Sequence, residues 1–149
     1  MTPTLFGRIQ TRWALLATFG VVWTLIIGPF LPSPDGASLS DVYRALFTAL
    51  LIVAVVGVLW ELLYHLLQQY RWEKDWPTVF GLLLGIPEGI VTWFLLTRGI
   101  PFDVGEVPLA MFLIMFITVW ILVWAVANGP MQIFFLRWRY RGGRLNPKW

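Results

Sequence analysis

The amino-acid sequence predicts an all-α integral membrane protein, a bundle of four transmembrane helices joined by short loops, with both termini in the cytoplasm. Three observations lead to this fold class. The chain of 149 residues is 58% hydrophobic and 13% charged, whereas an average soluble domain carries about 25% charged residues. Four apolar stretches are each long enough to cross a hydrocarbon core of about 30 Å. The basic residues also gather in alternate connections between these stretches.

The first and second predicted spans cover residues 13–31 and 43–69. The first contains nineteen residues and no charged side chain. This apolar run is longer than the roughly 7–15 residues of a signal peptide, and no cleavage site of the A-x-A kind follows it, so we interpret it as a retained span. Ser38 and Ser40 precede the second span as candidate N-caps. A continuous helix over residues 41–71 would be about 46 Å long, which predicts that it tilts or extends beyond the membrane.

The third and fourth predicted spans cover residues 77–98 and 107–136, and a basic tail of residues 137–149 completes a single domain. Before its last residue, Arg98, the third span contains one charge, in the sequence GIPEGIV. The proline and glycine beside that charge predict a broken helix. In the fourth span, Pro130 lacks an amide hydrogen and its ring clashes with the preceding turn, which predicts a kink near residues 128–130. None of the stretches alternates in polarity at every second residue, so helices are favoured over β-barrel strands.

The distribution of Lys and Arg predicts the orientation of the bundle. Nine of the eleven basic residues lie before the first span, between the second and third spans, or after the fourth span. The positive-inside rule places these segments, and hence both termini, in the cytoplasm. Nine of the basic residues are Arg and two are Lys, which favours a bacterial chain and therefore the bacterial cytoplasmic (inner) membrane.

Three arginines of the tail alternate with aromatic residues directly after the last span, and a fourth follows three residues later. Such a segment is typical of contact with anionic lipid headgroups, or with a partner, rather than with nucleic acid. The predicted contact residues are Arg137, Arg139, Arg141 and Arg144.

Polar side chains inside the predicted spans are the candidate functional residues. Glu61, His65 and Gln68 stand at positions i, i+4 and i+7, so they share one helix face. Glu88 lies near the middle of the third span, where a carboxylate costs about 2.5–3.5 kcal/mol on insertion scales. We therefore expect it to be protonated or paired across a helix interface, at a depth roughly 10 Å from that of Glu61. Asn128 in the fourth span is a candidate partner for these groups.

Three glycines repeat at every fourth residue of the third span. These residues are Gly81, Gly85 and Gly89. Overlapping small-xxx-small spacing of this kind allows a second helix to approach closely. We expect this face to pack against another helix, in this chain or in a partner.

The cluster of Glu61, His65 and Glu88 admits several interpretations. Glu and His at i and i+4 could bind a metal with Glu88 as a third ligand, but the chain has a single histidine and the expected difference in depth argues against it. Acidic residues within membranes also act in proton or ion relays, and His65 could contact haem or quinone. We prefer the interpretation that these groups hydrogen-bond one another, other helices or a neighbouring subunit. We therefore expect neither a metal nor a cofactor.

The predicted function is that of an accessory or structural subunit of a larger membrane protein complex. The segments outside the membrane are too short to fold as a catalytic domain, and four spans leave little room for a substrate path. The expected partners are the lipid bilayer and other membrane subunits or further copies of the chain, and not nucleic acid. One alternative is a small homo-oligomeric proton-coupled transporter that uses Glu88. A second is a membrane enzyme acting on lipid, with Glu61 and His65 as acid–base groups.

Catalytic signatures do not favour an enzyme. The chain has no cysteine, so zinc–thiolate sites, iron–sulfur clusters and cysteine nucleophiles are excluded. The sequence contains none of the motifs G-x-G-x-x-G, G-x-S-x-G and H-E-x-x-H, and no P-loop. The enzyme alternative therefore depends on Glu61 and His65 alone.

Overall fold

The computed structural model describes residues 4–70 and 78–146, and within these two ranges its regular structure is entirely helical. Four helical segments are long and apolar enough to cross a membrane. The elements, in chain order, are α1 (Leu5–Leu15), a π-helical turn (Leu16–Gly20), α2 (Val21–Ile27), a 3₁₀ turn (Gly28–Phe30), α3 (Leu39–Gln69), α4 (Thr78–Leu83), α5 (Gly85–Thr97), α6 (Leu109–Asn128), α7 (Pro130–Phe134) and α8 (Leu136–Tyr140).

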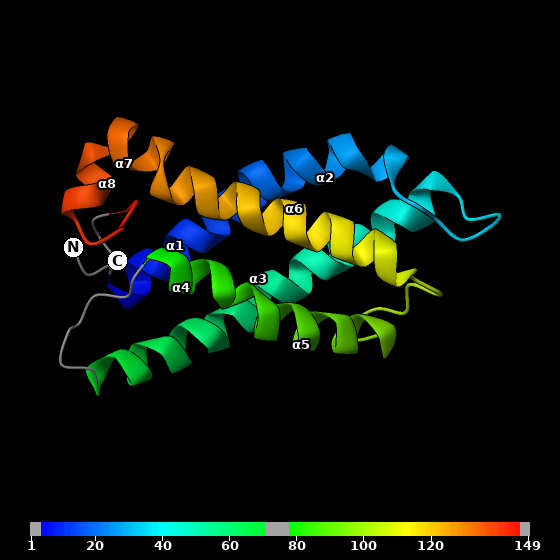
Figure 1. Cartoon of the computed structure of the whole chain (residues 1–149), viewed down its shortest axis with the longest axis horizontal. Coiled ribbons are helices and arrows are strands. Elements are labelled where there is room, and N and C mark those ends of the chain that lie inside the picture. The colour runs from blue at the N-terminus through cyan, green and yellow to red at the C-terminus, as the bar shows by residue number, and fades with distance from the viewer. Residues whose placement is uncertain (1–3, 71–77, 147–149) are drawn as a thin grey trace.

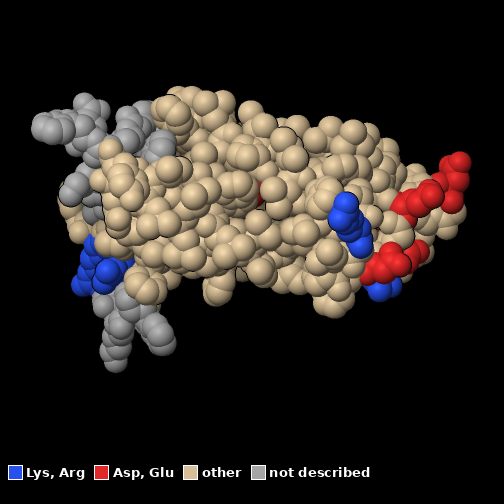
Figure 2. Space-filling model, turned by 90° about the horizontal axis from the view of Figure 1, so that it is seen from below, with Lys and Arg blue, Asp and Glu red and all other residues tan. Residues whose placement is uncertain are grey.

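The four spans run side by side along the long axis of the molecule, and both chain ends lie at the same end of the bundle (Figure 1). We call this the terminal end, and the opposite end, which carries the α2–α3 and α5–α6 connections, the loop end. Acidic side chains gather at the loop end (Figure 2). The predicted basic connection with Arg71 and Lys74, and the last basic residue, Lys148, lie outside the described residues.

The first span begins earlier than the sequence indicated. We predicted its start at residue 13, after the last charge, but α1 begins at Leu5. Thr4 is its N-cap, and the Thr4 hydroxyl accepts a hydrogen bond of 3.1 Å from the Gly7 amide. The helix therefore includes Arg8 and Arg12, because both side chains find partners on neighbouring helices.

The second span is a continuous helix of 31 residues with a capping box at its start. Of the two candidate serines, Ser38 is the N-cap. Its hydroxyl accepts from the Asp41 amide at 3.3 Å, and the Asp41 carboxylate accepts from the Ser38 amide at 3.1 Å. Two otherwise unpaired amides are thereby satisfied, which fixes where α3 begins.

The third span is broken at Leu84, three residues before Pro87. Pro87 has no amide hydrogen for the Leu83 carbonyl, so the proline interrupts the turn that precedes it rather than the position of Glu88. Two indole groups of α6 donate to carbonyls of α4: Trp120 Nε1 to Leu82 at 3.1 Å, and Trp124 Nε1 to Thr78 at 3.0 Å. These side chains hold α4 against α6 beside the break.

The fourth span kinks within the predicted range. The α6 helix ends at Asn128, Gly129 has φ −110° and ψ −97°, and α7 begins at Pro130. Pro130 cannot donate to the Val126 carbonyl, which accounts for the change of direction.

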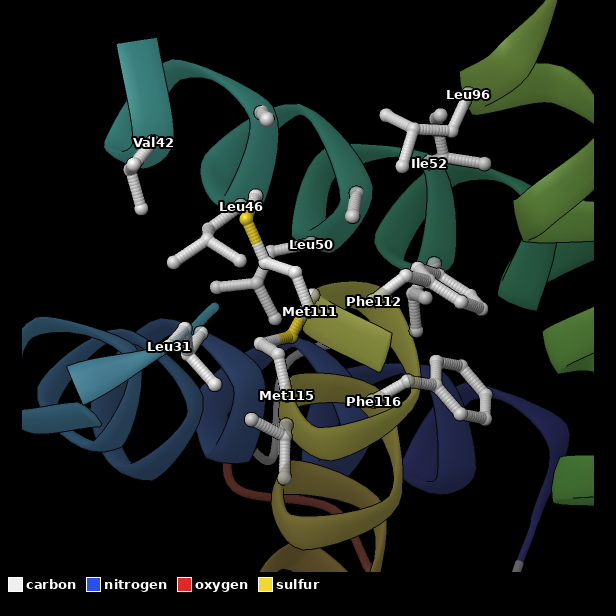
Figure 3. Close-up of a cluster of buried hydrophobic side chains, with 14 of the residues drawn as sticks. Leu31, Val42, Leu46, Leu50, Ile52, Leu96, Met111, Phe112, Met115 and Phe116 are labelled. Atoms are coloured by element: carbon white, nitrogen blue, oxygen red, sulfur yellow. The ribbon is translucent and has the colours of Figure 1, made fainter. Parts of the chain in front are cut away.

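The hydrophobic core lies between α3 and α6, with contributions from the first span and α5. Figure 3 shows Leu46 and Leu50 of α3 facing Met111 and Met115 of α6. Phe112 of α6 is also almost fully buried. Much of the outer surface is apolar, including exposed residues such as Leu59 and Ile90, as expected for helices in contact with lipid.

Candidate functional site

Arg12 of α1 joins three helices through its guanidinium group. Its Nη1 and Nη2 donate to the two carboxylate oxygens of Glu88 in α5, the second at 3.0 Å. Its Nε lies 3.4 Å from Oε1 of Glu61 in α3. The Glu88 side chain is fully buried and that of Arg12 is 12% exposed. A two-pronged Arg–carboxylate pair is among the stronger and more directional hydrogen-bonded contacts, so Arg12 fixes how α1, α3 and α5 are placed.

Arg8, one turn earlier, extends this network toward the terminal end. Its Nε lies 3.4 Å from Oε2 of Glu61, and its Nη2 lies 3.4 Å from Nδ1 of His65. Glu61 is therefore shared by two arginines. The two arginines and two glutamates carry no net formal charge together, which lowers the penalty for removing them from water.

Two residues shape the space around Arg12. A Cβ atom at Gly57 of α3 would overlap the Arg12 guanidinium, so only glycine leaves room for that group. On the other side, the Arg12 Cζ lies 5.6 Å from the centre of the Trp120 ring, within the range of a cation–π contact. Tyr64 of α3 is also buried, and its hydroxyl makes no hydrogen bond with the described residues.

The glycine face of the third span receives aromatic side chains rather than the backbone of another helix. Three rings of α6, also four residues apart, lie over the three glycines: Trp124 over Gly81, Trp120 over Gly85 and Phe116 over Gly89. The rings of Phe116 and Trp120 stack on each other, with centroids 5.7 Å apart. The face therefore packs against α6 of the same chain, and aromatic rings fill the space that the glycines leave.

The structure brings some predicted site residues together and leaves others outside the network. Glu61, His65 and Glu88 meet through Arg8 and Arg12, and not through direct contact with one another. The expected difference in depth between the two carboxylates was wrong, because both contact one guanidinium.

Two further predicted residues take different positions. Gln68 is buried in the last turn of α3. Asn128 is not placed as a partner of the two glutamates; its Nδ2 donates to the Trp124 carbonyl of its own helix at 2.8 Å. Its role is therefore local to the end of α6.

The tail folds back onto the start of α1. The Thr4 amide donates to the Gly142 carbonyl at 2.8 Å, and the Thr11 hydroxyl donates to the Gly143 carbonyl at 3.0 Å. Trp138 Nε1 donates to the Thr11 hydroxyl at 2.7 Å. Arg144 Nε donates to the Thr4 hydroxyl at 3.2 Å.

The four tail arginines therefore divide into two kinds. Arg144 is half-buried and belongs to the contact with α1. The other three are exposed at the terminal end: Arg137, Arg139 and Arg141. Only these three are available to lipid or to another protein.

Arg8 and Arg12 are the functional residues that sequence reasoning missed, because we interpreted them only as signals of orientation. A sequence signal was present. Arg8 and Arg12 are spaced i and i+4, as are Glu61 and His65, so one basic helix face matches one face that contains an acid. The helix start at Leu5 places both arginines on that face.

The described residues contain no group of three His, Cys, Asp or Glu side chains that could hold a metal ion. No protein-family model matches the chain, and neither a curated protein nor a solved structure matches it. Function is therefore inferred from the ion-pair network and the surfaces around it.

Proposed function

We propose that the protein is an accessory or structural subunit of a larger protein complex in the bacterial cytoplasmic membrane. One observation carries this proposal: the acidic residue at the middle of the third span is committed to the packing of the bundle. Glu88 is fully buried and accepts from both terminal nitrogens of Arg12. A carrier residue must gain and lose a proton in its cycle, but a neutral Glu88 would leave the buried Arg12 without its main counter-charge.

The terminal end offers a surface for contact with other molecules. The exposed Arg137, Arg139 and Arg141 lie next to the exposed aromatic residues Phe134 and Phe135. A basic and aromatic surface beside a span fits anionic headgroups or an acidic region of a partner subunit. This surface supports assembly, although it contributes nothing to the internal network.

We expect both termini to be cytoplasmic, because six of the eight basic residues that the structure describes lie at the terminal end. Reporter fusions at Trp149 and within residues 34–38 should report opposite sides of the membrane, the first cytoplasmic and the second periplasmic. A periplasmic reporter signal at Trp149 would contradict the orientation and the proposed location of the tail.

Native mass spectrometry after extraction in a mild detergent tests the proposed function. We expect the chain to be recovered with at least one different membrane protein at a fixed ratio. A homodimer without other proteins would favour the transporter instead. In that case, proton flux into liposomes should depend on Glu88, and a Glu88→Gln variant that keeps the dimer but abolishes the flux would establish the transporter and overturn the subunit.

A further inference from the structure

A cavity of about 280 Å³ lies between the first span, α3 and α6 at the terminal half of the bundle. Its walls are mainly hydrophobic side chains, and Trp138 and Gly143 of the tail border it at the terminal end. On α6 it extends from Met115 to Asn128, about 20 Å along the helix axis. A cavity of this volume and length is narrow, and we call it the slot. Its shape fits an extended chain better than a ring system.

The polarity of this slot changes in one direction along all three of its main walls. At the terminal end it is lined by Arg8 of the first span, Glu61 of α3 and Gln132 of α7. Toward the middle of the bundle the first span contributes Leu16, α3 contributes Leu50 and α6 contributes Met115. A membrane lipid has this polarity, with a polar group at the membrane surface and a hydrocarbon chain that reaches inward. A polar metabolite would place polar groups at the inner end, where the hydrophobic walls offer few hydrogen-bond partners and burial would cost free energy.

The polar end of the slot favours a negatively charged group. Arg12 is paired with Glu88, so the Arg8 guanidinium, beside Glu61, is the cation at this end that can take a further anionic partner. The Nε of Arg8 is buried and makes no hydrogen bond with the described residues, although it lies at ion-pair distance from Glu61. An arginine has five N–H donors, so Arg8 has capacity for a phosphate oxygen. The exposed tail arginines stand at the same end of the bundle.

An empty slot would be unfavourable. Its hydrophobic walls would lose packing contacts, and water fills a cavity only where polar partners can hold it. The inner part of this slot has few such partners, whereas a hydrocarbon chain satisfies its walls.

We propose that this slot binds one acyl chain of an anionic phospholipid, drawn from the leaflet that faces the terminal end, with the lipid phosphate next to Arg8. This site is independent of whether the chain assembles with other subunits, since its walls come from a single copy. The lipid completes the packing between α1, α3 and α6, and its phosphate adds an acceptor for the Arg8 N–H groups that do not face Glu61 or His65.

Native mass spectrometry of the purified full chain, titrated with phosphatidylglycerol or with phosphatidylcholine, tests the site. We expect one phosphatidylglycerol to be retained per chain, with phosphatidylcholine bound about tenfold more weakly. Replacing Ala127, which lines the slot, by Phe should fill it and weaken retention of phosphatidylglycerol by at least about tenfold. Ala125→Phe is the matched control, because Ala125 is exposed on the same helix and does not line the slot, and it should change nothing.

A second measurement needs no variant and covers the case in which Ala127→Phe does not fold. A ligand that binds only the folded state raises the midpoint of unfolding, and the rise grows with the ratio of ligand concentration to Kd. Phosphatidylglycerol should raise the midpoint of the unaltered chain, and phosphatidylcholine at the same concentration should raise it less. Equal retention by the two Phe variants, or equal effects of the two lipids, would overturn the proposal.

Discussion

Replacing Arg12 with Gln is expected to lower the free energy of unfolding by about 3–5 kcal/mol. The variant leaves the carboxylate of Glu88 fully buried without its two charge-assisted hydrogen bonds. It also removes one of the two arginines that pair with Glu61 and leaves only Arg8. Removing one partner of a buried ion pair is strongly destabilising. The remaining charge is still buried away from water, and it no longer has the attraction of its partner.

Unfolding in mixed detergent–SDS micelles would measure this loss. Arg137→Gln is the matched control, because it removes an exposed arginine from the same end of the bundle and should leave the unfolding midpoint unchanged. The double variant Arg12→Gln, Glu88→Gln should recover most of the stability, since it buries no unpaired charge at the Glu88 position. If Arg12→Gln were as stable as Arg137→Gln, Arg12 would be only a signal of orientation.

Gly85→Ala is expected to lower the free energy of unfolding by about 1–3 kcal/mol, which is typical of overpacking. A Cβ at this position would lie 2.6 Å from Nε1 of Trp120, closer than real Cβ contacts. The indole would have to move, and its hydrogen bond to the Leu82 carbonyl and its contact with the Arg12 guanidinium would both be disturbed. One added methyl group should therefore affect the break in the third span and the ion-pair network together.

Gly81→Ala should have the opposite effect under the same unfolding measurement. A Cβ at Gly81 would lie 3.6 Å from Cδ1 of Trp124, which is ordinary van der Waals contact. Ala is favoured over Gly in a helix by roughly 0.5–1 kcal/mol, so this variant should be neutral or slightly stabilised. If Gly85→Ala and Gly81→Ala changed the free energy of unfolding by the same sign and size, the predicted steric conflict between Gly85 and Trp120 would be wrong.

Local features of the fold could be predicted from the sequence because each depends on neighbouring residues. The four apolar stretches correspond to the four helical segments that are long enough to span a membrane. Ser38 caps α3, and the fourth span kinks at Gly129, before Pro130. In each case the deciding group, a hydroxyl or a missing amide hydrogen, acts within one helical turn.

The ion-pair network could not be predicted in the same way, because its members are far apart in the sequence. Arg12 and Glu88 are separated by 76 residues. Their meeting depends on which helices are neighbours and on how far each is shifted along its axis. Depth estimated by counting residues along separate helices carries no information on relative shift, and it ignores the reach of a long arginine side chain. The glycine spacing predicted that another helix packs against this face. It could not identify the aromatic rings of α6 that cover the glycines, because those rings are also far away in the sequence.

The distance between Arg12 and Glu88 in the chain has a consequence for synthesis on the ribosome. Translation adds about 5–20 residues per second, so Glu88 is made roughly 4–15 s after Arg12, which precedes it by 76 residues. During that interval Glu61 of α3 is the one carboxylate of the network that Arg12 can reach, so we expect the guanidinium to stay close to headgroups and water. We therefore expect α1, the first helix to be translated, to reach its final depth only after the third span has brought Glu88 into the membrane.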